Sequence, residues 1–266
     1  MKRTDRILAG FCLLLPWFAS AEILPVEGTP GIVSAQQVVH AQQEHAVGLS
    51  RIRIGSYNIQ DYFEGREGAR RTWEKARQQG RLAAAILDEI EADVLVLQEI
   101  ETAAMLELLN GKLARPYPHG YITALGTSVG RSVRLNLAVL SRLPLRDVVG
   151  IDFSTLDGPG RPTRGLLRFV VDLDADTELL VYNVHLKANW GDRQRNISQR
   201  YHALNLLQED LARQRAQGFT GMVLIAGDFN FDPTRREFRR EPALKVLRSP
   251  LIVFMCRGLE GHNAGV

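Results

Sequence analysis

Four apolar segments of the chain each end in polar residues that can bind a metal ion or transfer a proton. These residues are Asn58, Glu99, His185 and the pair Asp228 and Asn230. In α/β sheets, functional sites collect where strands emerge from the core, so we expect these side chains to meet at one place. A carboxylate such as Glu99 is costly to bury without a partner, and a bound metal ion is the simplest partner.

The residue types at these strand ends favour Mg²⁺, with Mn²⁺ or Ca²⁺ as alternatives. Mg²⁺ prefers oxygen ligands and is usually held by one or two carboxylates together with waters and a substrate phosphate. A zinc site is disfavoured because the sequence has no pair of nearby cysteines and no His-x-x-x-His pattern. The sequence also has no P-loop and no Gly-x-Gly-x-x-Gly fingerprint.

Apolar periodicity predicts the elements that must position these residues. Strands are predicted over residues 52–59, 93–100, 121–125, 136–141, 166–172, 179–186 and 222–226, and helices over 72–91, 103–113, 198–215 and 241–248. Strands that alternate with helices indicate a layered α/β domain. Residues 22–50 are rich in glutamine and show little periodicity, so we expect an irregular leader on the surface. A last apolar run, residues 251–255, follows the final predicted helix.

The N-terminal residues have the pattern of a secretory signal peptide. Lys2, Arg3 and Arg6 precede an apolar run that ends in Ala19-Ser20-Ala21, and we expect cleavage after Ala21. An uncleaved membrane anchor is the alternative, and it is disfavoured because the run is short and contains a proline. The mature protein is therefore expected in the periplasm or outside the cell, as a monomer without a stable membrane partner.

The composition is that of a folded protein with a nearly balanced charge. The 266 residues are 45% hydrophobic and 24% charged, which excludes a disordered chain. The formal net charge is +3, and the predicted signal peptide carries three cations and one anion, so the mature chain is left with +1. Such a chain has no global attraction to nucleic acid, so polyanion binding must come from local clusters. Only Cys256 remains after cleavage, so no internal disulfide is expected.

Five segments, taken in order, resemble the successive motifs of the endonuclease/exonuclease/phosphatase superfamily. The superfamily includes DNase I, the exonuclease III class of endonucleases, inositol polyphosphate 5-phosphatases and bacterial sphingomyelinases. The segments are Gly55-Ser56-Tyr57-Asn58-Ile59, Leu97-Gln98-Glu99-Ile100, Asn136–Leu145, Asn183-Val184-His185-Leu186-Lys187 and Gly227-Asp228-Phe229-Asn230. Each motif alone is weak, but five in the family's order over residues 52–232 form a specific signal. The resemblance implies a four-layered α/β sandwich (DNase I-like), with two sheets face to face and helices outside.

The resemblance also implies metal-assisted hydrolysis of a phosphoester by an in-line water. Glu99 would be the principal Mg²⁺ ligand, and Asn58 would steady the metal and its waters. The expected catalytic residues are His185, Asp228 and Asn230. Asp228 would orient or deprotonate the attacking water, while Asn230 would hydrogen-bond a phosphate oxygen and His185 would stabilise the charge that builds on the phosphate.

Three further residues, Arg164, Lys187 and Asn189, are expected to contact the substrate. Many family members keep a phosphate-side arginine at the position of Arg164, and a solvated loop arginine is the alternative. Two arginine clusters follow the expected catalytic strands and could grip a polyanion, with Trp190 available for stacking; a solvated face is the alternative. The clusters are Arg193, Arg195 and Arg200, and Arg235, Arg236, Arg239 and Arg240.

The sequence departs from the family's pattern at its end. The family normally closes with a strand that carries an Asp-His pair, and this sequence has no Asp-His dipeptide. We therefore expect a signal peptide over residues 1–21, a leader over 22–50 and a C-terminally truncated domain over 51–266 that lacks its last strand. Loss of one general acid or base would lower the rate by about 10²- to 10⁴-fold.

Three classes of function follow from these observations. The leading expectation is a secreted Mg²⁺-dependent phosphodiesterase, with DNA or RNA as the substrate because of the arginine clusters. A phospholipid or phosphomonoester hydrolase of the same superfamily is the first alternative, and it would call for an apolar membrane-docking hairpin that the sequence does not clearly provide. A catalytically dead binding module is the second alternative, because of the missing Asp-His pair. Metal dependence separates both enzymes from the binding module.

Overall fold

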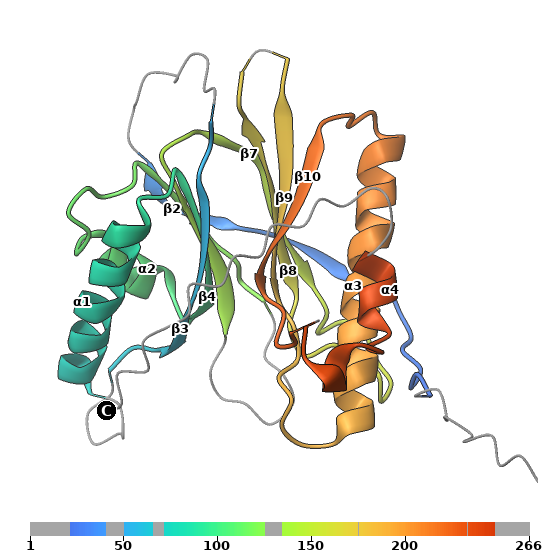
Figure 1. The fold of residues 1–266 in the computed structure, drawn as a ribbon. Coiled ribbons are helices and arrows are strands. Elements are labelled where there is room, and N and C mark those ends of the chain that lie inside the picture. Colours follow the sequence, from blue (N-terminus) through green and yellow to red (C-terminus); the bar gives the residue numbers. More distant parts are fainter. Residues whose placement is uncertain are drawn as a thin grey trace, which may run out of the picture.

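Two five-stranded sheets, packed face to face, form the centre of the computed structural model, which describes residues 22–40, 51–65, 72–125, 135–174, 176–232 and 234–247 (Figure 1). The first sheet has the order β1 (Gly31–Ser34), β7 (Leu145–Asp152), β8 (Leu166–Asp172), β9 (Glu178–His185) and β10 (Met222–Asp228). The second has the order β2 (Gln36–His40), β5 (His119–Ile122), β6 (Asn136–Ser141), β4 (Val94–Ile100) and β3 (Ile54–Tyr62).

Helices cover the outer face of each sheet. The helices α1 (Trp73–Ile90) and α2 (Ala103–Asn110) lie on the second sheet, and α3 (Arg193–Ala216) lies on the first with α4 (Ala243–Leu247) packed against it (Figure 1). A short 3₁₀ helix, η1 (Arg236–Phe238), precedes α4. The layer order of helix, sheet, sheet and helix confirms the predicted four-layered α/β sandwich.

Three buried apolar clusters hold the layers together. The cluster between the sheets includes Val96 of β4 and Phe169 of β8. The other two lie under the helices, where Leu87 of α1 packs on the second sheet and Leu207 of α3 on the first. Both faces of each sheet are therefore covered, which explains why the central strands read as continuous apolar runs in the sequence.

The expectation of an irregular leader is wrong for residues 31–40. β1 pairs with β7 and β2 pairs with β5, both antiparallel, so this segment supplies an edge strand to each sheet. An edge strand needs only one apolar face, and here Val33 packs inward while Ile32 is 59% exposed. The preceding residues are tied to α3, because Leu24 N–H donates to Ser198 Oγ at 2.9 Å and His202 Nε2 lies 2.7 Å from the Leu24 carbonyl oxygen.

Two other elements differ from the predicted pattern. β7 has no counterpart among the predicted strands, because a register shift after Arg146 and a left-handed φ of 52° at Asp147 interrupt its alternation. The long helix α3 begins at Arg193 instead of residue 198, with Asp192 as its N-cap accepting from the Arg195 N–H. Its first turns bury polar side chains, which apolar periodicity cannot detect.

Two expectations fall outside the described residues. The signal peptide over residues 1–21 and the apolar run over 251–255 both lie there. Within the described residues, no helix combines the length and the apolar character that crossing a membrane requires.

Candidate functional site

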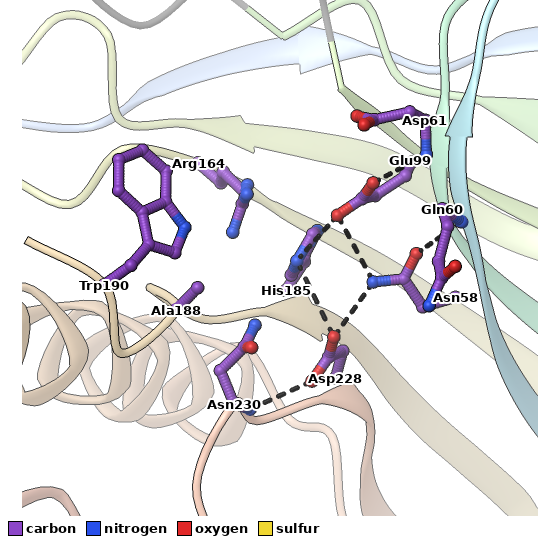
Figure 2. Close-up of a pocket in the computed structure, with 10 residues that line it drawn as sticks. All are labelled: Asn58, Gln60, Asp61, Glu99, Arg164, His185, Ala188, Trp190, Asp228 and Asn230. Atoms are coloured by element: carbon purple, nitrogen blue, oxygen red, sulfur yellow. Dashed lines mark hydrogen bonds and ion pairs between the residues drawn. The ribbon is translucent and has the colours of Figure 1, made fainter. Parts of the chain in front are cut away.

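The carboxyl ends of four strands, two from each sheet, meet at one end of the sandwich. β3 runs parallel to β4, and β9 runs parallel to β10. The two pairs touch across the sheets, since β3 contacts β10 and β4 contacts β9. The side chains of Asn58, Glu99, His185 and Asp228 point toward one another in Figure 2, with Asn230 beside Asp228. The structure thus brings together all five residues that stand at the predicted strand ends.

Glu99 lies at a β-bulge that turns its side chain toward the site. The register of β4 against β6 shifts between Gln98 and Ile100, and Glu99 has a left-handed φ of 67°. Such a backbone costs of order 1–3 kcal/mol for a residue other than glycine, and it persists only where the surroundings hold it. The carboxylate is held as well, because the Asp61 N–H donates to Glu99 Oε2 at 2.7 Å.

Asn58 bridges the two acidic side chains. Its Nδ2 donates to Asp228 Oδ2 at 2.9 Å and to Glu99 Oε1 at 3.3 Å, while its Oδ1 accepts from the Gln60 N–H at 2.9 Å. The amide nitrogen therefore faces the carboxylates and the amide oxygen faces the backbone. In this arrangement Asn58 fixes the distance between the two acids.

His185 completes the group from the first sheet. Its Nε2 lies 3.4 Å from Glu99 Oε1 and 3.7 Å from Asp228 Oδ2. The His185 side chain is 1% exposed, so burial and the neighbouring strands restrict its orientation. Nε2 is therefore aimed at the space between the two carboxylates.

Gly227 allows β10 to place Asp228 directly beside His185. Its φ is +133°, and a Cβ at this position would lie 2.0 Å from the Val184 carbonyl oxygen. The next residue pair in the register is Asp228 with His185. Asp228 Oδ1 then accepts from the Asn230 N–H at 2.9 Å, and Asn230 has a left-handed φ of 54°. The turn after β10 is thus built around the carboxylate.

Replacing Gly227 with alanine is expected to lower the free energy of unfolding by at least about 2 kcal/mol, because both the backbone conformation and the contact with Val184 become unfavourable. Gly218→Ala is the matched control, since Gly218 has a φ of +100° with nothing within 4 Å of the added Cβ. It carries only the conformational cost, about 1 kcal/mol. Urea unfolding measures both, and equal losses would contradict the close approach at Gly227.

A buried polar contact joins the two sheets beneath the site. Gln98 Nε2 donates to Asn183 Oδ1 at 2.8 Å, and Asn183 Nδ2 donates to the carbonyl oxygens of Leu97 (3.0 Å) and Ala138 (3.1 Å). Both amide side chains are fully buried. Because each precedes a site residue by one or two positions, this contact fixes the strands that carry Glu99 and His185 relative to each other.

Two tyrosines of β3 stand on either side of Asn58 in the sequence. Burial raises the pKa of the Tyr57 phenol, and it raises the pKa of Tyr62 to about 12. Neither phenol therefore supplies a base near neutral pH, which leaves the carboxylates and the imidazole for that role.

The converging side chains line a pocket of about 310 Å³. Gln60 and Asp61 belong to its wall and were not predicted from the sequence. They have consecutive left-handed φ values of 62° and 51°, which turn the chain at the end of β3 back toward the site. The complete set of lining residues is Asn58, Gln60, Asp61, Glu99, Arg164, His185, Ala188, Trp190, Asp228 and Asn230 (Figure 2).

The donor set of the pocket fits a hard divalent cation. Glu99 Oε1 and Asp228 Oδ2 converge, since both accept from the same amide nitrogen of Asn58. Their side chains are 14% and 29% exposed, so the pair is open on one side. Among the described residues, no group of three or more His, Cys, Asp and Glu side chains is arranged to hold an ion. The pocket therefore offers a pair of carboxylates, which is the protein contribution that Mg²⁺ typically uses.

The three expected substrate-contacting residues have different positions. Arg164 lines the pocket, where its Nη1 donates to the Leu186 carbonyl oxygen at 3.0 Å. Lys187 Nζ lies 4.2 Å over the ring of Trp190, and Asn189 Nδ2 donates to the Asn230 carbonyl oxygen. Lys187 and Asn189 contact lining residues in this way but are not themselves among the described residues that line the pocket.

The two predicted arginine clusters are exposed except for one member. Six of these arginines lie on the surface: Arg193, Arg195, Arg235, Arg236, Arg239 and Arg240. Arg200 was expected in an exposed basic loop, and this is wrong, because the residue lies inside α3 and is 2% exposed. Nothing in its sequence neighbourhood distinguishes a buried arginine from a surface one, since the burial depends on Glu241, 41 residues away.

One pattern that can carry different chemistry lies outside the described residues. Gly126-Thr127-Ser128-Val129-Gly130 matches the Gly-x-Ser-x-Gly pattern of a serine nucleophile. In the described part of the chain, the pocket shows carboxylate, amide and imidazole groups and no serine.

Comparison with known families and structures gives one sequence match and several matches of fold. A model described as Endonuclease/Exonuclease/phosphatase family matches residues 55–261. None of the curated proteins searched matches the chain.

Among solved structures, SmcL matches with a TM-score of 0.50 and 15% identity over 73% of this chain and 68% of its own. TDP2 from C. elegans matches with a TM-score of 0.47 and 16% identity, over 68% of this chain and 48% of its own. A β-hairpin deletion mutant of beta toxin from Staphylococcus aureus matches with a TM-score of 0.49 and 15% identity, over 74% of this chain and 73% of its own. The chain thus spans about half the length of the TDP2 structure. At this identity, the likeness to SmcL shows a shared fold.

Proposed function

Because the chain belongs to the endonuclease/exonuclease/phosphatase family, we propose that it is a divalent-metal-dependent phosphodiesterase that cleaves nucleic acid. The observation that carries the proposal is the convergence of Glu99, Asp228 and His185 on one open pocket that Arg164 also lines. Metal-assisted phosphoester hydrolysis requires carboxylates that hold a cation. It also requires cationic or neutral hydrogen-bond donors that bind the phosphate.

Glu99 and Asp228 would hold the metal ion, for which Mg²⁺ is our first choice. When bound, this cation neutralises the negative charge of the phosphate and of the leaving oxygen. Arg164 would orient the phosphate, since a planar guanidinium suits its oxygens. His185 Nε2 is aimed at the same space and would donate to a phosphate oxygen as charge builds on it.

Asp228 would also orient the attacking water and accept its proton. The new P–O bond forms as the ester P–O bond on the opposite side breaks, and the leaving oxygen takes a proton from water. Asn230 keeps Asp228 in place through its backbone N–H, and its Nδ2 donates to the Leu186 carbonyl oxygen at 2.9 Å. An amide nitrogen carries two N–H groups, so one remains for a phosphate oxygen.

Exposed arginines that closely follow the pocket residues in the sequence support nucleic acid as the substrate. Arg193 and Arg195 begin α3 directly after the pocket loop, and the other exposed cluster follows β10. Trp190 lines the pocket and is 65% exposed, so its ring is available for stacking on a base. A polyanion that crosses the pocket would meet several guanidinium groups beyond the reacting phosphate.

Cleavage of DNA is expected to depend steeply on salt. If about four exposed arginines each bind a phosphate, kcat/KM for plasmid DNA falls about 10²-fold between 50 and 200 mM salt. Arg193→Gln/Arg195→Gln flattens this slope. Arg146→Gln is the control, because Arg146 pairs with Asp172 and Glu178 at the other end of the sheet. A flat response for plasmid DNA would remove the arginines from the substrate site.

The same assay tests the substrate class. Bis(p-nitrophenyl) phosphate has a single phosphate, so its hydrolysis should change less than about threefold over the same salt range. Faster hydrolysis of a phospholipid or of a phosphomonoester than of DNA would favour the other hydrolase classes. Absence of hydrolysis with every substrate, from folded protein with Mg²⁺, would favour a binding module. Secretion is part of the proposal and is supported by the signal-peptide pattern of residues 1–21.

A further inference from the structure

A buried arginine lies behind the pocket, outside the group that would touch the substrate. Arg200 is among the largest fully buried side chains of the described residues and projects from α3 toward the loops that follow β9 and β10. Burying a guanidinium is costly, so its retained charge must be matched by specific contacts. Those contacts indicate what the residue does.

Arg200 makes three hydrogen bonds with different partners. Its Nε donates to Glu241 Oε1 at 2.8 Å, in an ion pair whose two side chains are 2% and 3% exposed. Its Nη1 donates to the Lys187 carbonyl oxygen and to Asn189 Oδ1, both at 2.8 Å. One planar group thus connects the segment before α4 with the loop after β9.

The connection continues to the proposed water-activating carboxylate. Asn189, oriented by Arg200, donates through Nδ2 to the Asn230 carbonyl oxygen. Asn230 in turn donates its N–H to Asp228 Oδ1 at 2.9 Å. A continuous series of hydrogen bonds therefore runs from Glu241 through Arg200 and Asn189 to the site.

We propose that Arg200, held by Glu241, is a positioning residue that locks the loops after β9 and β10 in the geometry that catalysis requires. The expected effect on the rate rests on the proposed function. The fixing of the two loops rests on the hydrogen bonds alone. A displacement of the order of 1 Å at a reacting group can cost about 10²-fold in rate, so the side chain that sets the loop position has a large effect without touching substrate.

Lysine cannot replace this arginine even though it keeps the charge. Arg200 reaches partners on two sides through a rigid fork, whereas a single ammonium on a flexible stem can serve only one side at a time. Arg200→Lys is therefore expected to keep the pair with Glu241 and to release Asn189.

A second, partly buried arginine provides the matched control. Arg168 of β8 pairs with Asp210 of α3 at 3.0 Å, with side chains 12% and 2% exposed. This pair also joins α3 to the first sheet, but neither residue lines the pocket. Arg168→Lys thus perturbs a comparable ion pair in the same interface without reaching the loops.

The kinetic test compares the two variants in the full chain. Arg200→Lys should lower kcat for bis(p-nitrophenyl) phosphate at least about tenfold with little change in KM, and Arg168→Lys should stay within about twofold of the wild type. Adding Asn189→Ala to Arg200→Lys should lower kcat no further than the worse single variant, because both act through one contact. Equal effects of the two lysine variants, or additive losses with Asn189→Ala, would overturn the proposal.

A readout independent of activity uses Trp190, which follows the anchored loop residues. In a Trp17→Phe/Trp73→Phe background it is the single tryptophan of the chain. Arg200→Lys should increase the fast component of its time-resolved fluorescence anisotropy, and Arg168→Lys should not. If Arg200→Lys fails to fold, Asn189→Ala alone should reproduce both changes, because Asn189 is exposed. An unchanged anisotropy would refute the positioning role, whereas inactivity of the wild type with the anisotropy change present would refute only the proposed function.

Discussion

Glu99→Gln should lose at least about 10³-fold in kcat/KM, together with most of the affinity for Mg²⁺. The substitution keeps the size of the side chain but removes the charge that would hold the cation. It also disturbs the local hydrogen bonds, because Glu99 accepts from Asp61 N–H at one oxygen and from Asn58 Nδ2 at the other. An amide can place an acceptor at only one of these positions. A rate loss of this size corresponds to about 4 kcal/mol of transition-state stabilisation.

The matched control for this variant is Glu101→Gln. Glu101 follows Glu99 by two residues and accepts from the Glu64 N–H at 2.7 Å, and it is not among the residues that line the pocket. Its substitution should leave kcat/KM within about twofold of the wild type. Calorimetric titration with Mg²⁺ and steady-state kinetics measure the two effects separately. Wild-type Mg²⁺ affinity in Glu99→Gln would exclude Glu99 as the principal ligand.

Asp228→Asn should lower kcat/KM by about 10²- to 10⁴-fold, the range for losing a general base. A cation held by Glu99 would still neutralise the phosphate, so some activity should remain. Both oxygens of Asp228 accept hydrogen bonds, from Asn58 Nδ2 and from the Asn230 N–H. Asparagine would turn its own N–H group toward one of these two donors, so one of the two hydrogen bonds would be lost.

Asp232→Asn is the control for the second variant. Asp232 belongs to the same loop, and hydrogen bonds from Thr234 hold the pKa of its carboxyl below the usual value. The side chain is 47% exposed and lies outside the pocket, so its substitution should change kcat/KM less than about twofold. An active Asp228→Asn variant would mean that another group takes the proton from the water.

The sequence predicts those parts of the fold that depend on apolar periodicity. The strands β4, β8 and β9 lie inside their sheets and were predicted close to their observed bounds, because both faces of each sheet are covered. The edge strand β1 is different, since its residues alternate between partly buried and exposed and its sequence resembles a loop. The strand β7 is interrupted by a bulge, and no periodic pattern survives that interruption.

The sequence predicts which residues form the site, but not the contacts that hold them in place. Asn58, Glu99, His185 and Asp228 each follow apolar residues of a predicted strand, so their chemistry is visible along the chain. Contacts between distant segments are not visible in this way, and they hold the site together. The pair of Gln98 and Asn183 joins residues 85 positions apart, and Arg200 reaches Glu241 over 41 positions. The wall residues Gln60 and Asp61 depend on left-handed backbone that no local signal indicates.

The most direct test of the account is hydrolysis of plasmid DNA and of bis(p-nitrophenyl) phosphate by the full chain with Mg²⁺ and with a chelator. We expect cleavage of both substrates with Mg²⁺, its loss when the chelator is added and its return when Mg²⁺ is restored in excess. Sustained cleavage in the presence of chelator would contradict a metal-dependent site built on Glu99 and Asp228. Absence of cleavage by folded protein that binds Mg²⁺ would contradict the assignment of phosphodiesterase activity.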